Sequence, residues 1–209
     1  MVADALKRLL DIVAAAIGIV VLSPFLVLVA LAVKITSPGP VFYRGERTGR
    51  FGKTFRIYKF RTMILNAEQV GGSTTAEADP RITSIGRKLR KYKIDELPQL
   101  FNVLRGEMSM VGPRPEVPEY TQLYQGDFHR ILTLRPGITD PASMQFHDLQ
   151  ACVGSENADE VFREKILPVK NQLRLKYVDE QTIRGDVVIL LKTLAIVLSK
   201  PCVIIRKLL

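Results

Sequence analysis

An apolar segment without any charged residue runs from Ile12 to Val33, and it limits how this chain can fold. Its roughly 22 residues are enough for a helix to cross about 30 Å of hydrocarbon. The segment is too long for the apolar core of a signal peptide. Lys34, Ile35 and the turn TSPGP follow it, so no small-residue cleavage site is present. We therefore expect the segment to remain in the mature protein.

Ser23 and Pro24 stand in the middle of this apolar segment. Pro24 has no N–H to bond the carbonyl of Val20, and its ring clashes with that carbonyl, which predicts a kink. The hydroxyl of Ser23 can bond the freed carbonyl, and this makes a sharp bend tolerable in lipid. The pair is therefore a candidate point of membrane re-entry.

Basic residues flank the apolar segment on both sides. Lys7 and Arg8 precede it, and Lys34, Arg44, Arg47, Arg50 and Lys53 follow it. Because basic residues prefer the cytoplasmic side, a helix over 1–36 that enters one leaflet and returns satisfies both flanks. The alternative is a kinked helix that crosses once, since proline is common in spanning helices. The flanking charges favour re-entry.

The composition narrows the setting and the partners. The 30 Lys and Arg residues against 21 Asp and Glu give a net charge of +9, which suits nucleic acid, an anionic membrane surface or a phosphorylated substrate. No recognised nucleic-acid motif or aromatic-basic stacking platform is present, so we expect no nucleic-acid partner. The only cysteines, Cys152 and Cys202, show no metal-ligand spacing, which favours a reducing, cytoplasmic setting. His129 and His147 have no visible partner and receive no role.

Residues 37–209 are expected to form one compact, mostly helical domain. Residues 41–63 predict a strand, a glycine-rich turn and a second strand, and residues 66–80 predict a polar loop. A helix follows whose apolar stripe consists of Leu97, Leu100, Phe101 and Leu104. The apolar stretch 187–198 is too short to span and predicts a helix on the membrane surface or against the domain. The fold class is thus α+β: a membrane helix, a small β-hairpin and surface amphipathic helices.

The stretch KIDELPQL allows two interpretations. In the first, Asp95 is a helix N-cap, Glu96 lies in the first turn, and Pro98 is tolerated there. In the second, the helix N-terminus keeps a carboxylate ionised, so that it can attack phosphorus or bind a hard divalent cation. Adjacent helical residues project about 100° apart, which suits different roles for the two acids.

Several basic residues are candidate phosphate ligands. Arg114 stands between Pro113 and Pro115 in a stiff turn, and arginine matches phosphate oxygens with paired donors. Arg135, before Pro136-Gly137, is a weaker candidate of the same type. In the strand TFRIYKFR, the side chains of Lys59 and Arg61 share one face. The alternative in each case is a solvated side chain on a rigid element.

Taken together, KFRTM (59–63), DELPQLFNVLRGEMSMVGPRP (95–115) and LRPGIT (134–139) resemble the bacterial sugar transferase family, the monotopic phosphoglycosyl transferases. The resemblance includes the Ser23-Pro24 hairpin and runs over most of the chain. The long central motif is highly specific, whereas KFRTM or RPGIT alone would be weak. The length is similar to that of the small members.

The resemblance implies a reaction and a location. A phosphosugar moves from a UDP-sugar to polyprenyl (undecaprenyl) phosphate, giving a polyprenyl diphosphosugar and UMP, as the first membrane step of a bacterial glycoconjugate pathway. It implies a bacterial inner membrane protein with a re-entrant helix, whose catalytic domain faces the cytoplasm at the cytoplasmic leaflet. A homo-oligomer is possible.

The resemblance also implies roles for residues. Asp95 looks like the nucleophile that forms a phosphosugar-enzyme intermediate, and Glu96 looks like a ligand of the required Mg²⁺. The side chains that look like phosphate or nucleotide contacts are Lys59, Arg61, Arg114 and Arg135, with Pro113 and Pro115 as the framework of Arg114.

Two positions depart from the family pattern. Lys93 stands where relatives more often have a small hydroxyl residue, and Asp140 follows RPGIT where many have glycine. The second departure weakens the inference that the loop from Thr139 onward binds its donor in the usual way. We expect sugar selection to depend on the loops around 66–80 and 139–157. The rival hypothesis is a non-enzymatic, membrane-tethered basic scaffold that binds anionic lipids or acidic partners.

Overall fold

The computed structural model describes residues 2–72, 74–76, 79–154 and 157–199, and it begins with one long helix, α1 (Val2–Thr36). The helix continues through Pro24. As expected, the Ser23 hydroxyl donates to the carbonyl of Val20, at 2.8 Å. Within the described residues, α1 is the one helix long and apolar enough to cross a membrane, by length and composition.

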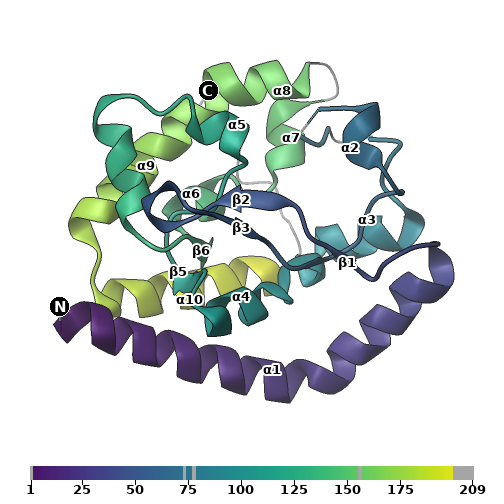
Figure 1. Cartoon of the computed structure of the whole chain (residues 1–209), viewed down its shortest axis with the longest axis horizontal. Helices are drawn as coiled ribbons and strands as arrows, with labels where there is room; N and C mark the ends of the chain where they lie inside the picture. Colours follow the sequence, from purple (N-terminus) through teal and green to yellow (C-terminus); the bar gives the residue numbers. More distant parts are fainter. Residues whose placement is uncertain (1, 73, 77–78, 155–156, 200–209) are drawn as a thin grey trace.

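Figure 1 shows α1 running along one side of the domain, so that its two halves reach different parts of it. Near its N-terminus, Lys7 forms an ion pair with Asp186, and Arg8 donates to the carbonyl of Val103 at 2.7 Å. Toward its other end, Leu26, Val29 and Val33 are buried in a cluster that includes Phe60 and Leu89. Both halves of the apolar helix are therefore attached to the same domain.

The predicted hairpin is present. Strands β2 (Glu46–Thr48) and β3 (Thr54–Arg56) pair antiparallel on either side of the 3₁₀ turn η1 (Arg50–Gly52). The shorter strands β1 (Phe42–Tyr43) and β4 (Lys59–Phe60) extend the same antiparallel arrangement. Lys59 therefore lies at the end of this arrangement that is farther from the turn η1.

A parallel pair of strands, which the sequence did not predict, joins the loop at Gly112-Pro113 to the loop at Pro136-Gly137. Strand β5 (Ser109–Val111) pairs with β6 (Gly137–Thr139), and the Gly112 N–H donates to the carbonyl of Thr139 at 3.0 Å. A Cβ atom on Gly137 would lie 2.1 Å from the backbone nitrogen of Gly112, so this crossing requires glycine. The segment that carries Arg114 is therefore held against the loop that follows β6.

Helices form most of the remaining structure and enclose the strands. They are α2 (Ala67–Val70), α3 (Ser84–Lys91), η2 (Ile94–Glu96), α4 (Gln99–Arg105), α5 (Pro118–Thr121), η3 (Gly126–Thr133), α6 (Pro141–Gln145), α7 (Leu149–Val153), α8 (Ala158–Val161), the π-helical η4 (Phe162–Ile166), α9 (Leu167–Glu180) and α10 (Ile183–Leu198). As expected, α10 packs against the domain, contacting β5 and α6, and also exposes an apolar face.

The apolar stripe predicted for 97–104 is partly wrong. Leu100 is buried against α1, but Phe101 and Leu104 are each 37% exposed. The buried face of α4 instead includes Gln99, Asn102 and Val103. The Asn102 amide explains part of the difference, because its oxygen accepts from the Tyr58 N–H at 2.8 Å and ties α4 to the hairpin.

Candidate active site

Asp95 and Glu96 lie in the short 3₁₀ helix η2, which follows α3 through a tight turn. Lys93 makes this turn in the left-handed region, with φ of 56°. The first interpretation of KIDELPQL, in which Asp95 caps a helix, is wrong: Lys93 occupies the N-cap of η2, Pro98 occupies that of α4, and neither cap uses a side-chain hydrogen bond. Asp95 is instead buried, and its Oδ1 atom has no hydrogen-bond partner among the described residues.

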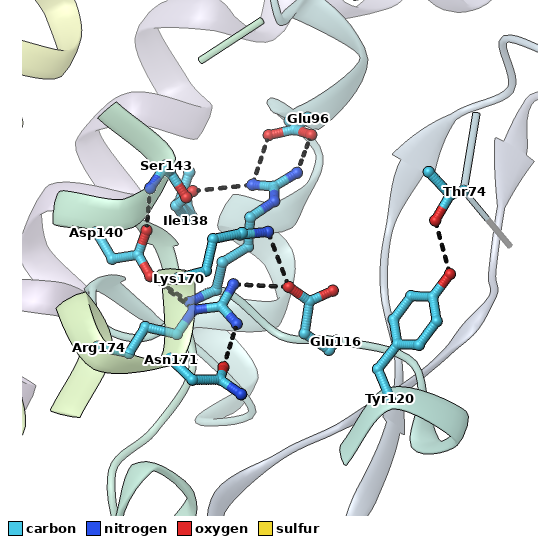
Figure 2. Close-up of polar contacts among 11 residues, drawn as sticks. Thr74, Glu96, Glu116, Tyr120, Ile138, Asp140, Ser143, Lys170, Asn171 and Arg174 are labelled. Atoms are coloured by element: carbon cyan, nitrogen blue, oxygen red, sulfur yellow. Dashed lines mark hydrogen bonds and ion pairs between the residues drawn. The ribbon is translucent and has the colours of Figure 1, made fainter. Parts of the chain in front are cut away.

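Glu96 is held by two cationic side chains from distant segments. Lys59 Nζ on β4 donates to Glu96 Oε1 at 3.0 Å. Arg114 donates to both carboxylate oxygens, with Nη1 2.9 Å from Oε2. The same Nη1 lies 3.2 Å from the carbonyl of Ile138. Figure 2 labels Glu96 and Ile138, the two residues that accept these hydrogen bonds. The fork-shaped contact fixes the plane of the guanidinium relative to Glu96.

The two neighbouring acids have opposite pKa shifts. Burial raises the pKa of Asp95, the charge of Glu96 raises it further, and the nearby cations only partly oppose this. Burial also acts to raise the pKa of Glu96, but Arg114 and Lys59 outweigh it and hold this pKa well below its usual range. The expectation of an ionised carboxylate therefore fits Glu96 best, whereas Asp95 is a carboxylate that its surroundings satisfy poorly.

Arg90 on α3 is a further cation whose charge acts on this pair. Its Nε donates to the Thr62 hydroxyl at 2.9 Å. Burial lowers the pKa of Arg90, and the charge of Asp95 is the first of those that oppose this shift. Arg90 therefore adds a third guanidinium or ammonium group, beside those of Lys59 and Arg114, to the surroundings of the two acids.

The structure brings together Lys59, Asp95, Glu96 and Arg114, but it places Arg61 and Arg135 in other contacts. Arg61 is 6% exposed and donates to the carbonyl of Ser37 at 2.6 Å, at the end of α1. The alternation that put Lys59 and Arg61 on one face predicted a shared site for both.

Arg135 lies near the N-terminus of α1. It donates to the carbonyl of Gly106 at 3.2 Å, and its Nη1 is 3.7 Å from a carboxylate oxygen of Asp4. Pro113 and Pro115 flank Arg114 as expected, and the carbonyl of Pro113 accepts from the Gly137 N–H at 3.0 Å.

Four further charged residues lie behind Arg114, and the sequence analysis gave none of them a role. They are Glu116, Asp140, Lys170 and Arg174, and Figure 2 shows how they converge. Glu116 Oε1 accepts from Lys170 at 2.9 Å and from Arg174 at 2.7 Å. The residues are spread over about 60 positions, so no local pattern could have grouped them. The one available signal was the departure from the family pattern at Asp140.

The two acids lie outside a sizeable cavity that the described residues line. A cavity of about 660 Å³ lies between the segment that holds Thr74 and the helices α8 and η4. The Tyr120 hydroxyl contacts Thr74 Oγ1 at 2.7 Å and also donates to Asp159. Neither Asp95 nor Glu96 lines this cavity. The candidate site is therefore identified by its charged groups and not by the volume of a cavity.

The donor set around Asp95 and Glu96 is compatible with magnesium. Mg²⁺ usually takes one or two carboxylates and completes its shell with water and substrate phosphates. Asp95 Oδ1 is a buried oxygen without a hydrogen-bond partner in the described part of the chain, and such an atom suits a hard cation. Glu96 would need to share an oxygen that Lys59 or Arg114 now contacts.

Comparisons with known proteins find similar sequences over most of the chain. A family model described as bacterial sugar transferase matches residues 2–200. The chain is 37% identical over 207 residues to a UDP-glucose:undecaprenyl-phosphate glucose-1-phosphate transferase of Caulobacter vibrioides, covering 94% of this chain and 71% of that protein. It is 36% identical over 197 residues to a UDP-N-acetylgalactosamine-undecaprenyl-phosphate N-acetylgalactosaminephosphotransferase of Aeromonas hydrophila, covering 93% and 44%. The chain therefore spans under half of the second relative's length.

Proposed function

Because the chain belongs to the bacterial sugar transferase family, we propose that it transfers a sugar 1-phosphate from a UDP-sugar to undecaprenyl phosphate. The observation that carries the proposal is Asp95. It is a buried carboxylate, one oxygen of which has no hydrogen-bond partner among the residues that the structure describes, and it lies near Lys59, Arg90 and the Glu96–Arg114 pair. A carboxylate that is poorly satisfied in the resting protein is suited to form a bond to phosphorus.

The transfer takes place in two displacements at one phosphorus atom. An oxygen of Asp95 attacks the phosphorus that bears the sugar, the bond to the bridging oxygen of the diphosphate breaks, and UMP leaves with that oxygen. The sugar phosphate is then an acyl phosphate on Asp95. An oxygen of undecaprenyl phosphate attacks the same phosphorus, and the bond to Asp95 breaks, which restores the carboxylate and gives the diphosphosugar lipid.

Fixed cations make this transfer between anions possible. Lys59 and Arg114 are held by Glu96, and Arg90 by Thr62, so their charges need little reorganisation when a diphosphate enters. Magnesium, held by Asp95 or Glu96, would supply further charge neutralisation for the diphosphate. The role of Glu96 is thus to orient two cations and to offer an oxygen to the metal.

The membrane helix α1 enters one leaflet and returns, in this proposal, with the domain at the cytoplasmic face. The support comes from its contacts: Lys7 near the N-terminal end pairs with Asp186, and Val33 near the other end is fully buried in the domain. A helix attached at both ends to one domain cannot place those ends on opposite sides of a bilayer. This depth suits an acceptor whose phosphate lies at the membrane interface.

Cysteine labelling tests the orientation of α1. We expect Leu6→Cys and Phe51→Cys, in a background with Cys152 and Cys202 replaced by serine, to resist a membrane-impermeant maleimide in intact cells. Both should react after the cells are opened, because Leu6 is 47% and Phe51 67% exposed. A control must show that the maleimide does not enter the intact cells. Under that condition, labelling of Leu6→Cys but not of Phe51→Cys would show that α1 crosses the membrane.

The proposed reaction is tested by UMP release from a panel of UDP-sugars with undecaprenyl phosphate and Mg²⁺. We expect UMP that depends on the lipid and on the metal, with one donor preferred. The preferred donor would also identify the sugar. Failure of every donor with folded, membrane-inserted protein would contradict the proposal and favour the membrane-tethered basic scaffold.

A further inference from the structure

Arg114 is the most exposed member of a largely buried chain of alternating charges. Glu96 and Lys59 lie on one side of it, with side chains 14% and 19% exposed, and Arg114 itself is 24% exposed. On the other side lie Asp140 and Arg174, whose side chains are both 0% exposed. The substrate would therefore meet one end of the network, while the other end is fixed inside the domain.

The backbone N–H of Arg114 is the only one available in the Pro-Arg-Pro segment, because neither proline has one. This N–H donates to Asp140 Oδ2 at 2.9 Å. The other oxygen of the same carboxylate, Oδ1, accepts from the Ser143 N–H at 2.6 Å and caps α6. Asp140 therefore uses one oxygen for its own helix and the other for Arg114, which glycine at this position could not do.

Arg174 on α9 holds both sides of the Arg114 segment. Its Nε lies 3.2 Å from Asp140 Oδ2, and its Nη2 lies 2.7 Å from Glu116 Oε1. Its Nη1 contacts Asn171 Oδ1 at 3.2 Å, which anchors the guanidinium to α9. One planar side chain thus fixes the acceptor of the Arg114 N–H and the side chain two residues after Arg114, as the lower part of Figure 2 shows.

We propose that Asp140 and Arg174 are positioning residues that set the orientation of the Arg114 guanidinium toward Glu96 and the substrate diphosphate. The inference rests on the proposed function for its catalytic consequence, and on the contacts above for its structural one. A small rotation of the Arg114 backbone is enough to misalign a two-bond contact to a carboxylate or phosphate. A residue on α9, about 60 positions from Arg114, therefore takes part in the site without touching the substrate.

Asp140→Asn separates the two duties of Asp140 with little change in shape. Asparagine is a good N-cap, so its single oxygen can still accept from Ser143. Its NH₂ group then faces the Arg114 N–H and Arg174 Nε, where two donors meet. Arg174→Lys is the second variant: it keeps the charge, but a single ammonium group cannot reproduce the planar fork.

The experiment measures kcat and KM for the preferred UDP-sugar, together with hydrogen exchange of the peptide that spans 112–117. We expect each variant to lower kcat about tenfold to hundredfold with little change in KM, because each variant changes the contacts that support Arg114 and leaves Arg114 itself in place. Exchange of the Arg114 N–H should become faster in Asp140→Asn, and Pro113 and Pro115 simplify its assignment. The double variant should lose no more kcat than the less active of the two single variants, since both substitutions act on one contact.

Asp186→Asn is the matched control, because Asp186 is also buried, accepts from Tyr177 at 2.7 Å and pairs with Lys7. It should leave both kcat and the exchange at Arg114 close to wild type. The proposal is overturned if Asp140→Asn and Arg174→Lys fold normally and keep kcat within about twofold of wild type, or if Asp186→Asn has the same effect on kcat.

The two readouts distinguish this inference from the proposed function. If the wild-type protein releases no UMP from any donor, the proposed function fails. Faster exchange at Arg114 in Asp140→Asn, without a change in Asp186→Asn, would then still support the positioning contact. Unchanged exchange in a catalytically active Asp140→Asn variant would overturn the positioning role and leave the reaction intact.

Discussion

Asp95→Asn is expected to abolish UMP release, by at least about a thousandfold, because an amide cannot form the bond to phosphorus. The same variant is expected to keep or increase the free energy of unfolding at pH 7. Burial raises the pKa of Asp95, and its Oδ1 atom has no partner among the described residues, so the ionised form opposes folding. Lipid-dependent UMP release and urea unfolding measure the two effects.

The control for this variant applies the same chemical change to a carboxylate that has partners. Asp79 is buried and forms a two-bond contact with Arg81, with distances of 2.6 Å and 2.9 Å. Asp79→Asn should therefore lower the free energy of unfolding, by about 1–3 kcal/mol, whereas Asp95→Asn should not. UMP release that survives in Asp95→Asn would remove Asp95 as the nucleophile, and a loss of stability equal to that of Asp79→Asn would contradict the argument from burial.

Arg174→Met should destabilise the protein by about 3–5 kcal/mol, because it leaves the buried carboxylate of Asp140 without its cation. Within the described residues, Arg174 is the only side chain that forms an ion pair with Asp140, whereas Glu116 keeps Lys170. A loss of this size corresponds to a fall of about 10 °C in the melting temperature of a domain of this length. Thermal unfolding of the detergent-solubilised chain measures it.

The second variant of this test removes the stranded charge. Asp140→Asn in the Arg174→Met background should recover part of the lost stability, since the neutral amide no longer needs a cation. No recovery in the double variant would show that the loss comes from packing of the long arginine side chain rather than from charge.

The pH dependence of stability gives a further check on the same network. Burial acts to raise the pKa of Asp140 and of Glu116, but Arg174 lowers the first, Lys170 and Arg174 lower the second, and both values end below their usual range. A lowered folded-state pKa gives stability that is present above the unfolded-state value of about 4 and is lost as the pH falls further. The free energy of unfolding should therefore decrease when the pH is lowered below about 4. The decrease should be less steep in Arg174→Met than in the wild type.

Much of the fold could be predicted from local patterns in the sequence. The uncharged apolar run predicted α1, the turn residues of GRFGK predicted the hairpin, and the Ser23–Val20 hydrogen bond followed from the geometry of a proline in a helix. The parallel pairing of β5 with β6 could not be predicted in this way, because its partners lie about 28 residues apart and the strands are only three residues long.

The site divides in the same way between local and distant contacts. The motif around 95–115 pointed to Asp95, Glu96 and Arg114, and the structure brings them together with Lys59. Arg61 and Arg90 show the weakness of local reasoning: a strand-face argument grouped Arg61 with Lys59, and no local pattern assigned Arg90 to the site. Their final positions depend on which carbonyl or carboxylate a neighbouring segment provides.

The sequence by itself determined the chemistry available to this protein. It contains an uncharged apolar segment that must be covered by lipid or by protein, two adjacent acids, and an arginine fixed between prolines. Only the tertiary structure decided which acid is poorly satisfied and which is held by cations, because that depends on burial and on Lys59 and Arg114 arriving from other segments. It also decided that Arg174 and Asp140 support Arg114 from behind. Electrostatic energies fall off with distance and rise with burial, and neither quantity is written in the order of residues along a chain.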